Sequence, residues 1–343
     1  MKLAIFGDLH LGIRQNNTDW HDIAFEWCDS LVEDLHKRDI HDIVFLGDFF
    51  HNRNTISVNT LNAANKFLAR LREFKIHMIL GNHDLYYDSE YTTSAVALFD
   101  NFNNITVYSE PTFVEFGSKR ALMAGWGYDV LQYTADILFT HAEFATFKTN
   151  KKTSEREEGI SISEVLRHYP LVYSGHYHMR QSKSFDRGEV RYVGNPFPMD
   201  FSDEDLTKGF EVYDTETENI QFVKNTISPK YKRYKLSTLI KRRDFDELDA
   251  EIKNNFIELI IDKNITLQDV DRLIHLFSAK NPRQLTHEWE NGKSFSQTIE
   301  DFEATSFNTK DTIVEYIQMM NVPHKEDIIS YIIDLYERVE ELV

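Results

Sequence analysis

Histidine, aspartate and asparagine side chains follow directly after several short apolar runs of the chain. The runs end in Gly-Asp-Leu-His, Gly-Asp-Phe-Phe-His, Gly-Asn-His-Asp, Thr-His and Gly-His-Tyr-His. The residues in these endings that can bind a metal ion or transfer a proton are Asp8, His10, Asp48, His51, Asn82, His83, Asp84, His141, His176 and His178. Imidazole nitrogens with carboxylate or carboxamide oxygens form mixed ligand sets, which suit manganese, iron or zinc better than magnesium or calcium. The pattern therefore predicts a transition-metal site.

The spacing within these endings supports a common site. In an extended segment, residues i and i+2 point the same way, so Asp8 with His10, and His176 with His178, are expected to face one side. Glycines precede Asp8, Asp48, Asn82 and His176 and permit sharp turns. Taken singly, each histidine is more often structural or exposed. However, six of the 14 histidines lie in these endings, and we interpret only the other eight as ordinary.

The elements that must position these residues are strands alternating with helices. Before residue 215, strands are predicted at residues 3–6, 42–46, 77–80, 121–124, 136–139, 171–173, 191–193 and 209–213, and helices at 23–37 and 58–74. Such alternation predicts an α/β fold with parallel pairing, and the short later connections favour antiparallel or mixed pairing. Since ligands bind beyond the carboxyl ends of such strands, the polar endings should converge on one crevice.

The pattern of predicted strands and helices changes near residue 216. A strand at 220–223, a strand at 256–261 and a helix at 267–277 predict a small α+β unit. A polar stretch follows, and then two amphipathic helices separated by Asn321-Val322-Pro323. The expected organisation is residues 1–215 as the main domain, 216–290 as a small α+β domain, 291–310 as a linker and 311–343 as a helix pair.

Composition excludes several classes of protein. With 343 residues, 41% hydrophobic and 27% charged, the chain is globular, of two or three domains, and no apolar run could cross a membrane. The single cysteine, Cys28, excludes a disulfide framework or a cysteine zinc site within the chain. Without a secretory signal, a cytoplasmic location is expected.

The net charge of −18 disfavours a nucleic-acid partner, but the charge is unevenly distributed. Residues 224–243 contain eight Lys or Arg residues and no acid. Such a strip can follow phosphates because binding responds to the local field. The other interpretation is a solvated linker, and the sequence alone does not decide between them.

The motif set resembles the calcineurin-like metallophosphoesterases, whose Asp-x-His, Gly-Asp-x-x-His, Gly-Asn-His-Asp and Gly-His-x-His motifs occur here in order between residues 8 and 178. The second motif lacks the Asp-Arg-Gly ending of protein phosphatases, and Asp84 stands where those enzymes usually have Glu. The segment from Gly194 to Phe201 resembles the Gly-Ser-Pro segment of SbcD-type nucleases, with Asn195 in place of Ser. The compact length and acidic tail resemble the phage recombination endonuclease version of this group.

This resemblance implies a sandwich of mixed β-sheets flanked by helices, a small α+β cap, C-terminal helices and two divalent metal ions, most often Mn²⁺. Asp8, His10 and His178 would hold one ion, and Asn82, His141 and His176 the other, with Asp48 bridging them. His83 would be the catalytic histidine and His51 a second active-site histidine that positions substrate. Asp84 would either orient His83 or cap the next turn.

The resemblance also implies a DNA nuclease, with double-strand exonuclease and single-strand endonuclease activity, that acts with an SMC-like (SbcC-type) ATPase in DNA recombination, repair and replication. It implies a homodimer in which residues 58–74 pack across the twofold axis. The candidate DNA contacts are Lys230, Lys232, Arg233, Lys235, Arg242 and Arg243, and the candidate ATPase anchors are Ile317, Ile328, Ile332 and Tyr336.

Three alternatives remain open at this stage. An ordinary calcineurin-like phosphatase or cyclic-nucleotide phosphodiesterase would share the metal ligands and need neither cap nor docking helices. A scaffold subunit with a degenerate site would bind metal without turnover, although the complete ligand set argues against it. The C-terminal helices could also fold back onto their own domain instead of docking onto a partner.

Overall fold

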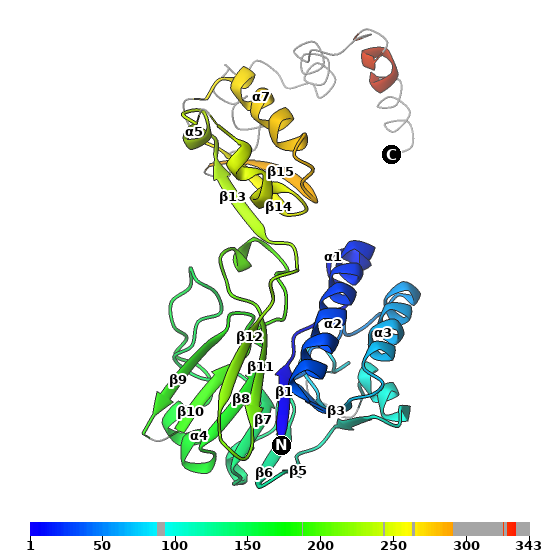
Figure 1. The fold of residues 1–343 in the computed structure, drawn as a ribbon, viewed down its shortest axis with the longest axis vertical. Coiled ribbons are helices and arrows are strands. Elements are labelled where there is room, and N and C mark those ends of the chain that lie inside the picture. The colour runs from blue at the N-terminus through cyan, green and yellow to red at the C-terminus, as the bar shows by residue number, and fades with distance from the viewer. Residues whose placement is uncertain are drawn as a thin grey trace.

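The chain folds into a large lobe with two β-sheets and a small lobe with a third sheet (Figure 1). The computed structural model describes residues 1–87, 93–186, 188–242, 244–262, 265–290, 325 and 328–333. We call residues 1–224 the double-sheet lobe and residues 231–289 the small lobe. The expected mixed α/β fold is confirmed.

The first sheet of the double-sheet lobe has the order β12-β11-β1-β2-β3-β4. Strands β1 to β4 run parallel, whereas β11 lies antiparallel to both β1 and β12. The strands are β1 (Lys2–Phe6), β2 (Asp42–Phe45), β3 (Lys75–Ile79), β4 (Ile105–Tyr108), β11 (Gly209–Asp214) and β12 (Ile220–Lys224).

The second sheet has the order β5-β6-β7-β8-β10-β9, with β6, β7, β8 and β10 parallel and antiparallel strands at both edges. Its strands are β5 (Thr112–Phe116), β6 (Lys119–Ala124), β7 (Ile137–His141), β8 (Leu171–Gly175), β9 (Gln181–Phe185) and β10 (Gly188–Tyr192).

Helices cover the outer faces of the two sheets, which pack against each other. The helices of this lobe are α1 (Ile13–Asn16), α2 (Thr18–Arg38), α3 (Val58–Arg70) and α4 (Ile162–His168), with short 3-10 helices at Ala95–Asn101, Val130–Gln132 and Phe201–Asp203. In β1, Ala4 and Phe6 face α2 and α3, while Leu3 and Ile5 face the second sheet. A strand buried on both faces requires a continuous apolar run, which explains why these residues do not alternate with polar ones.

The small lobe has the parallel sheet β13-β14-β15, made of β13 (Tyr231–Lys235), β14 (Phe256–Ile261) and β15 (Gln284–Trp289). Its helices are α5 (Leu236–Leu239), α6 (Asp249–Ile252), α7 (Leu267–Ser278) and a 3-10 helix at Asp246–Leu248. The lobe has its own apolar core, which includes Ile257, Leu259 and Phe277.

Aromatic side chains join the two lobes. The ring of Tyr231 stacks on Phe256 with centroids 4.5 Å apart, and Phe256 in turn lies 5.1 Å from Trp20 of α2. The Tyr231 hydroxyl donates a hydrogen bond to the Met199 carbonyl at 2.8 Å. These contacts hold the small lobe against one end of the double-sheet lobe, and Figure 1 shows the small lobe above that end.

The predicted C-terminal part of the chain lies mostly beyond the described residues. The expected linker at 291–310 lies outside them, as does most of the helix pair at 311–343. Residues 328–333 are helical, in agreement with the amphipathic pattern, and Tyr331 is exposed. Among the described residues, no helix combines the length and the hydropathy needed to cross a membrane.

Candidate metal centre

The loops that follow β1, β2, β3, β7 and β8 meet at one end of the double-sheet lobe. The first three strands belong to one sheet and the last two to the other. All seven predicted metal ligands come together there, which places the site between the carboxyl ends of two packed sheets. The role of each residue toward a metal stays a prediction.

Two glycines allow these loops to approach one another closely. Gly47 has a φ of 90°, and a Cβ at that position would lie 2.5 Å from the Gly81 nitrogen. A Cβ on Gly81 would lie 2.1 Å from Asp48 Oδ1 and 2.4 Å from the Asp48 nitrogen. Any larger residue would push the β2 and β3 loops apart, so these glycines are needed for close approach.

The prediction that Asp8 and His10 point the same way because they lie in an extended segment is wrong. Strand β1 ends at Phe6, and Asp8 and His10 have φ values of 53° and 47°, so the segment is not extended. Asp48 and His176 also have positive φ, at 57° and 89°. Non-glycine residues in such conformations cost about 1–3 kcal/mol each, and they concentrate at functional sites. The side chains therefore converge through left-handed turns and not through strand alternation.

The first predicted ligand group is compact and buried. His10 Nε2 and His178 Nε2 lie 2.9 Å apart, and the donor atoms of Asp8, His10 and His178 all lie within 4.8 Å of one another. Asp8 and His10 are 1% and 3% exposed. The Asp8 carboxylate accepts a hydrogen bond from the His176 backbone N–H at 2.9 Å, which ties the β1 loop to the β8 loop.

The second predicted ligand group converges on Asn82. Its Oδ1 lies 3.0 Å from His141 Nε2 and 3.0 Å from His176 Nδ1. His141 donates from Nδ1 to the Leu46 carbonyl at 2.7 Å, which orients the ring so that Nε2 faces the site. Asp48 Oδ2 lies 3.5 Å from both His141 Nε2 and His10 Nε2. Asp48 is therefore positioned between the two groups, as a bridging ligand must be.

The electrostatics follow from burial and from one central charge pair. Burial raises the pKa of the Asp8 carboxyl to about 7 and lowers the pKa of His10 well below its usual value. Burial also lowers the pKa of His176 to about 4. Burial opposes the charges of Asp48 and His141 too. Their mutual attraction outweighs it, raising the pKa of His141 to about 9 and holding that of Asp48 well below its normal range.

The residues present fit a divalent metal centre. Asp8 Oδ2 is a buried oxygen without a hydrogen-bond partner in the described part of the chain, and such an atom is costly unless something positive meets it. His10 Nε2 and His178 Nε2, 2.9 Å apart, are close enough for one cation to accept the lone pairs of both rings. With mixed nitrogen and oxygen donors, the chemistry is that of manganese, iron or zinc.

His83 and His51 lie at the more open side of this cluster. The backbone N–H of His83 donates to Asp48 Oδ1 at 2.8 Å, and its ring Nδ1–H donates to the His51 carbonyl at 2.6 Å. The two rings are stacked with centroids 5.7 Å apart. Because Nδ1 is occupied, Nε2 of His83 is the atom that remains for chemistry. This geometry is compatible with the predicted catalytic role, which remains a prediction.

Two acidic residues, Glu143 and Asp84, support the ligand cluster. The sequence analysis missed Glu143 and left the role of Asp84 open. Glu143 accepts a hydrogen bond from His176 Nε2 at 3.0 Å and was not singled out, although it follows His141 by two residues at the end of β7. Asp84 accepts backbone hydrogen bonds from Asp48, Phe49 and Gly81 at 2.7, 2.9 and 2.9 Å. It therefore ties the β2 loop to the β3 loop, whereas the ring of His83 is oriented by His51.

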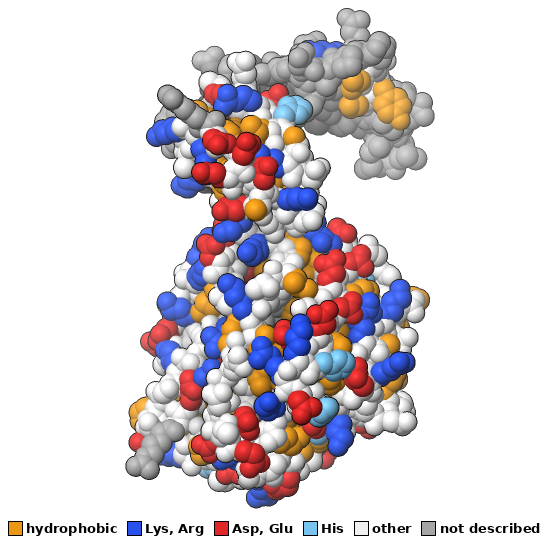
Figure 2. All heavy atoms as spheres, in the orientation of Figure 1, with side chains coloured by type: hydrophobic (Ala, Val, Ile, Leu, Met, Phe, Trp, Pro, Cys, Tyr) orange, Lys and Arg blue, Asp and Glu red, His pale blue; other side chains and the backbone are white. Residues whose placement is uncertain are grey.

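Most of the predicted DNA contacts are engaged with acids of the chain itself. The residues of the strip that form ion pairs are Lys232 with Asp205, Arg233 with Glu204 and Glu258, Lys235 with Glu290, and Arg242 with Glu247. Figure 2 shows Asp and Glu side chains among the Lys and Arg side chains of the small lobe. Lys230 is exposed, and Arg243 lies outside the described residues.

The four predicted partner anchors are only partly described. Ile328 and Ile332 lie in the helical segment 328–333 and are half-buried, while Ile317 and Tyr336 lie outside the described residues.

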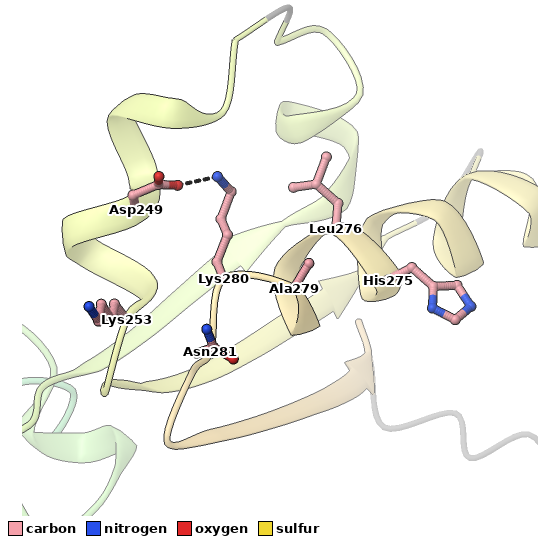
Figure 3. Close-up of a pocket in the computed structure, with 7 residues that line it drawn as sticks. All are labelled: Asp249, Lys253, His275, Leu276, Ala279, Lys280 and Asn281. Carbon is pink, nitrogen blue, oxygen red and sulfur yellow. Dashed lines mark hydrogen bonds and ion pairs between the residues drawn. The ribbon is translucent and has the colours of Figure 1, made fainter.

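Two cavities lie at different places on the molecule. One of about 690 Å³ lies on the small lobe beside α7 and is lined by residues such as Lys253, His275 and Lys280, the last of which pairs with Asp249 (Figure 3). Another, of about 370 Å³, lies in the double-sheet lobe and has His176 and His178 in its wall. Only the second adjoins the histidine cluster, so the larger cavity is not part of the candidate centre.

Two comparisons of the sequence with known proteins found similarity. The family model described as calcineurin-like phosphoesterase matches residues 1–205. The chain is 27% identical over 290 residues to exonuclease subunit 1 of Enterobacteria phage T4, with 80% of this chain and 82% of the relative covered.

Solved structures with similarity include an archaeal phosphodiesterase, at 14% identity and a TM-score of 0.39, covering 66% of this chain and all of that chain. They also include GAP50, the anchor in the inner membrane complex of Plasmodium, at 13% identity and a TM-score of 0.42, covering 86% of this chain and 99% of that chain. Similarity at this level supports no functional argument.

Proposed function

The chain belongs to the calcineurin-like phosphoesterase family, and on that premise we propose that it is a Mn²⁺-dependent DNA nuclease. It is a hydrolase of phosphoester bonds, and the relative from phage T4 is named as an exonuclease subunit. Asp48 between two histidine-rich groups carries the metal dependence, and the relative named as an exonuclease subunit carries the choice of a nuclease, since a phosphatase would share the same ligands.

Asp8, His10 and His178 would hold one ion and Asn82, His141 and His176 the other, with Asp48 shared between them. Two divalent cations held there would supply charge stabilisation for a phosphate group and an activated water as nucleophile. The surrounding protein supplies the orientation. Glu143 holds the ring of His176 and the Leu46 carbonyl holds that of His141, so each presents a defined nitrogen.

His83 would act on the leaving group. Its Nδ1–H is committed to the His51 carbonyl, so its Nε2 is the atom available to give a proton to the departing sugar oxygen. Asp48 holds the backbone of His83 at 2.8 Å, which fixes the histidine relative to the ligand cluster. His51, whose ring stacks against that of His83, would position the substrate.

The proposed organisation follows that of the nuclease subunits of SMC-like ATPase complexes. Of the predicted domains, 1–215 and 216–290, the first would extend to residue 224, because β12 (Ile220–Lys224) pairs with β11 in the nuclease domain, and the rest of the second would form a DNA-contacting cap. The linker at 291–310 would join the cap to an ATPase-docking helix pair at 311–343. A homodimer through α3 is supported by two exposed apolar side chains, Val58 at 74% and Leu61 at 41%. The location would be cytoplasmic, in the host cell if a phage encodes the chain.

The Lys and Arg side chains of the basic strip would contact DNA phosphates, and these contacts would replace their ion pairs with acidic residues of the chain. Each phosphate contact adds about 0.9 to the slope of log K against log salt for duplex DNA. Changing Lys230, Lys232 and Lys235 to Gln should weaken binding to every DNA sequence and flatten this slope, while cleavage of a small phosphodiester persists. An unchanged slope would mean that these lysines do not contact DNA and that the strip is a solvated surface of the small lobe.

The function is tested by offering the full chain four substrates with and without Mn²⁺. The substrates are linear duplex DNA, single-stranded DNA, a phosphopeptide and a cyclic nucleotide. We expect Mn²⁺-dependent cleavage of both DNAs and its loss in His83→Ser. Turnover of the phosphopeptide or cyclic nucleotide alone would favour the phosphatase or cyclic-nucleotide phosphodiesterase alternative, and metal binding without any turnover would favour the scaffold.

A further inference from the structure

A buried lysine lies directly behind one of the predicted metal ligands. Lys208 is 4% exposed and precedes β11, and its neighbours Asp203 and Asn195 are 4% and 0% exposed. Asn195 is the residue that stands in place of the usual Ser in the Gly-Ser-Pro-like segment. Charged side chains are almost never so deeply buried unless they are paired, so this cluster requires an explanation.

The three donors of the lysine ammonium group are all used. Nζ of Lys208 donates to the His178 carbonyl at 2.8 Å, to Asp203 Oδ1 and to Asn195 Oδ1. An ammonium group has three N–H donors and no acceptor, so its hydrogen-bonding capacity is complete. The amide of Asn195 also donates from Nδ2 to the Phe197 carbonyl at 2.8 Å and to Asp203 Oδ2 at 3.2 Å, two donor contacts that a serine hydroxyl, with its single O–H, could not both make.

The position of Lys208 connects the two sheets at the candidate centre. Ile5 of β1 faces Glu211 of β11, so the start of β11 lies beside the end of β1, which leads to Asp8 and His10. His178 instead follows β8 of the other sheet. Lys208 therefore reaches from the sheet that carries Asp8 and His10 to the loop that carries His178.

Stability alone is a weak explanation for this pair. Removing two charges from water is costly, and replacing a buried ion pair by apolar residues is often neutral or stabilising. A buried pair does fix orientation, because each partner leaves an unpaired charge if it moves. Residues that hold the ligands of a metal in place typically change its affinity by about 10–100-fold when they are lost.

We propose that Lys208, with Asp203 and Asn195, is a positioning residue that holds His178 in register with Asp8 and His10. The ammonium group fixes the backbone carbonyl of His178, and through it the ring nitrogen that lies 2.9 Å from His10 Nε2. This inference rests on the proposed metal site. It concerns one ion only, because no ligand of the other group accepts a hydrogen bond from Lys208 in the described part of the chain.

The test is a calorimetric titration of the full chain with Mn²⁺ alone, together with thermal unfolding. Wild type should bind two ions. Lys208→Met should bind one of them about 10–100-fold more weakly and the other unchanged, and excess Mn²⁺ should restore the lost occupancy. Asn195→Ala removes one acceptor of the ammonium group and the Asn195 hydrogen bonds to Phe197 and Asp203 but keeps the ion pair, so it should shift the same ion in the same direction by less.

The matched control is Tyr169→Phe, which deletes a buried hydrogen bond of 2.6 Å to the Val130 carbonyl in a separate part of the core. It should lower the unfolding temperature and leave both Mn²⁺ affinities unchanged. If Lys208→Met does not fold, the double change Lys208→Met with Asp203→Leu removes both charges and is compared in its place.

The possible results separate this inference from the proposed function. A wild-type chain that binds no Mn²⁺ would overturn the metal site and the inference with it. Two ions in wild type and unchanged affinities in the folded Lys208 variant, with only a lower unfolding temperature, would assign Lys208 a purely structural role. Equal weakening of both ions would also contradict a role specific to His178.

Discussion

Asp48 is the residue on which the two ligand groups depend most directly. Its Oδ2 lies 3.5 Å from a histidine of each group, and its Oδ1 holds the backbone of His83. The side chain is 2% exposed, so solvent cannot compensate for the loss of its negative charge. A change at this side chain should therefore be felt by both ions at once.

Asp48→Asn keeps the size of the side chain and removes its charge. We expect it to lose more Mn²⁺ than His10→Ala, which should weaken mainly one ion, since His10 belongs to a single group. Anomalous scattering from crystals soaked in Mn²⁺ would count the ions in each variant. Two ions at full occupancy in Asp48→Asn would contradict the bridging role.

His83→Ser should separate binding from turnover. It removes the proton donor and leaves the seven predicted ligands in place, so both Mn²⁺ ions should bind normally. Cleavage should fall by about 10²–10⁴-fold, the usual contribution of a general acid or base. Single-turnover rates measured at saturating Mn²⁺ would test this, and either a wild-type rate or a lost ion would reject the assignment.

The sequence was informative about residues whose type is rare enough to stand out. Histidines and glycine-flanked aspartates after apolar runs predicted a cluster that the fold does bring together. Glu143 and Lys208 were not found, because acids and lysines are common and only their partners, His176 Nε2 and the His178 carbonyl, distinguish them. The left-handed conformations of Asp8 and His10 were also missed, since no local pattern required them.

At the scale of elements, the close approach of the β2 and β3 loops depends on residues without side chains. Asp84 ties these loops together through backbone amides, and Gly81 leaves room for Asp48. The arrangement leaves no space for a methyl group between them.

Gly81→Ala should therefore act on both stability and metal binding. A Cβ 2.1 Å from Asp48 Oδ1 must displace the β2 loop, and overpacking of this kind costs about 1–3 kcal/mol. Urea unfolding and Mn²⁺ titration would measure the two effects. Gly188→Ala serves as control, because a Cβ there would crowd only the end of Leu166 and the Pro170 carbonyl, both at 3.0 Å, and none of the predicted ligands; it should leave Mn²⁺ affinity intact. Unaltered Mn²⁺ binding in Gly81→Ala would show that the loops tolerate separation.

Buried strands were easier to predict than edge strands. β14 was placed at its observed bounds, Phe256–Ile261, because it is apolar and central. The prediction missed five strands, β4, β5, β9, β13 and β15, and each of them lies at the edge of its sheet. Among them, β9 and β13 have the polar sequences Gln-Ser-Lys-Ser-Phe and Tyr-Lys-Arg-Tyr-Lys. Edge strands face solvent along one side, so polar residues are tolerated there and the apolar signal is weak. The basic strip therefore contains a strand of the small-lobe sheet.

At the scale of the whole molecule, the two lobes and the C-terminal segment have different proposed partners. The double-sheet lobe carries the ligand cluster, the small lobe is packed against it through Tyr231 and Phe256, and the proposed anchors for an ATPase come after both lobes in the sequence. A partner that binds only the C-terminal segment should thus be separable from catalysis.

Truncation after residue 305 should abolish co-purification with an SMC-like ATPase while Mn²⁺-dependent cleavage of single-stranded DNA survives. Short isolated helices are marginal in water, so their apolar faces need a surface to cover them. Ile332→Asp should have the same effect, because it would bury an unpaired charge in the interface. If the truncated chain still binds the ATPase or unfolds, the helices belong to this chain's own core.

Strand β1 lies in the middle of its sheet, between β2 and β11. Its partner β11 comes late in the chain, and the Thr215 hydroxyl reaches back to the Met1 carbonyl across 214 residues of sequence. During synthesis, β1 leaves the ribosome about 200 residues before β11, so one side of β1 stays unpaired until β11 emerges. Residues 2–6 are an open, apolar strand for that interval, which is a site for aggregation or chaperone capture. Ribosome stalling before residue 209 should therefore yield nascent chains that chaperones hold, and release should follow once the Gly209–Asp214 strand is available.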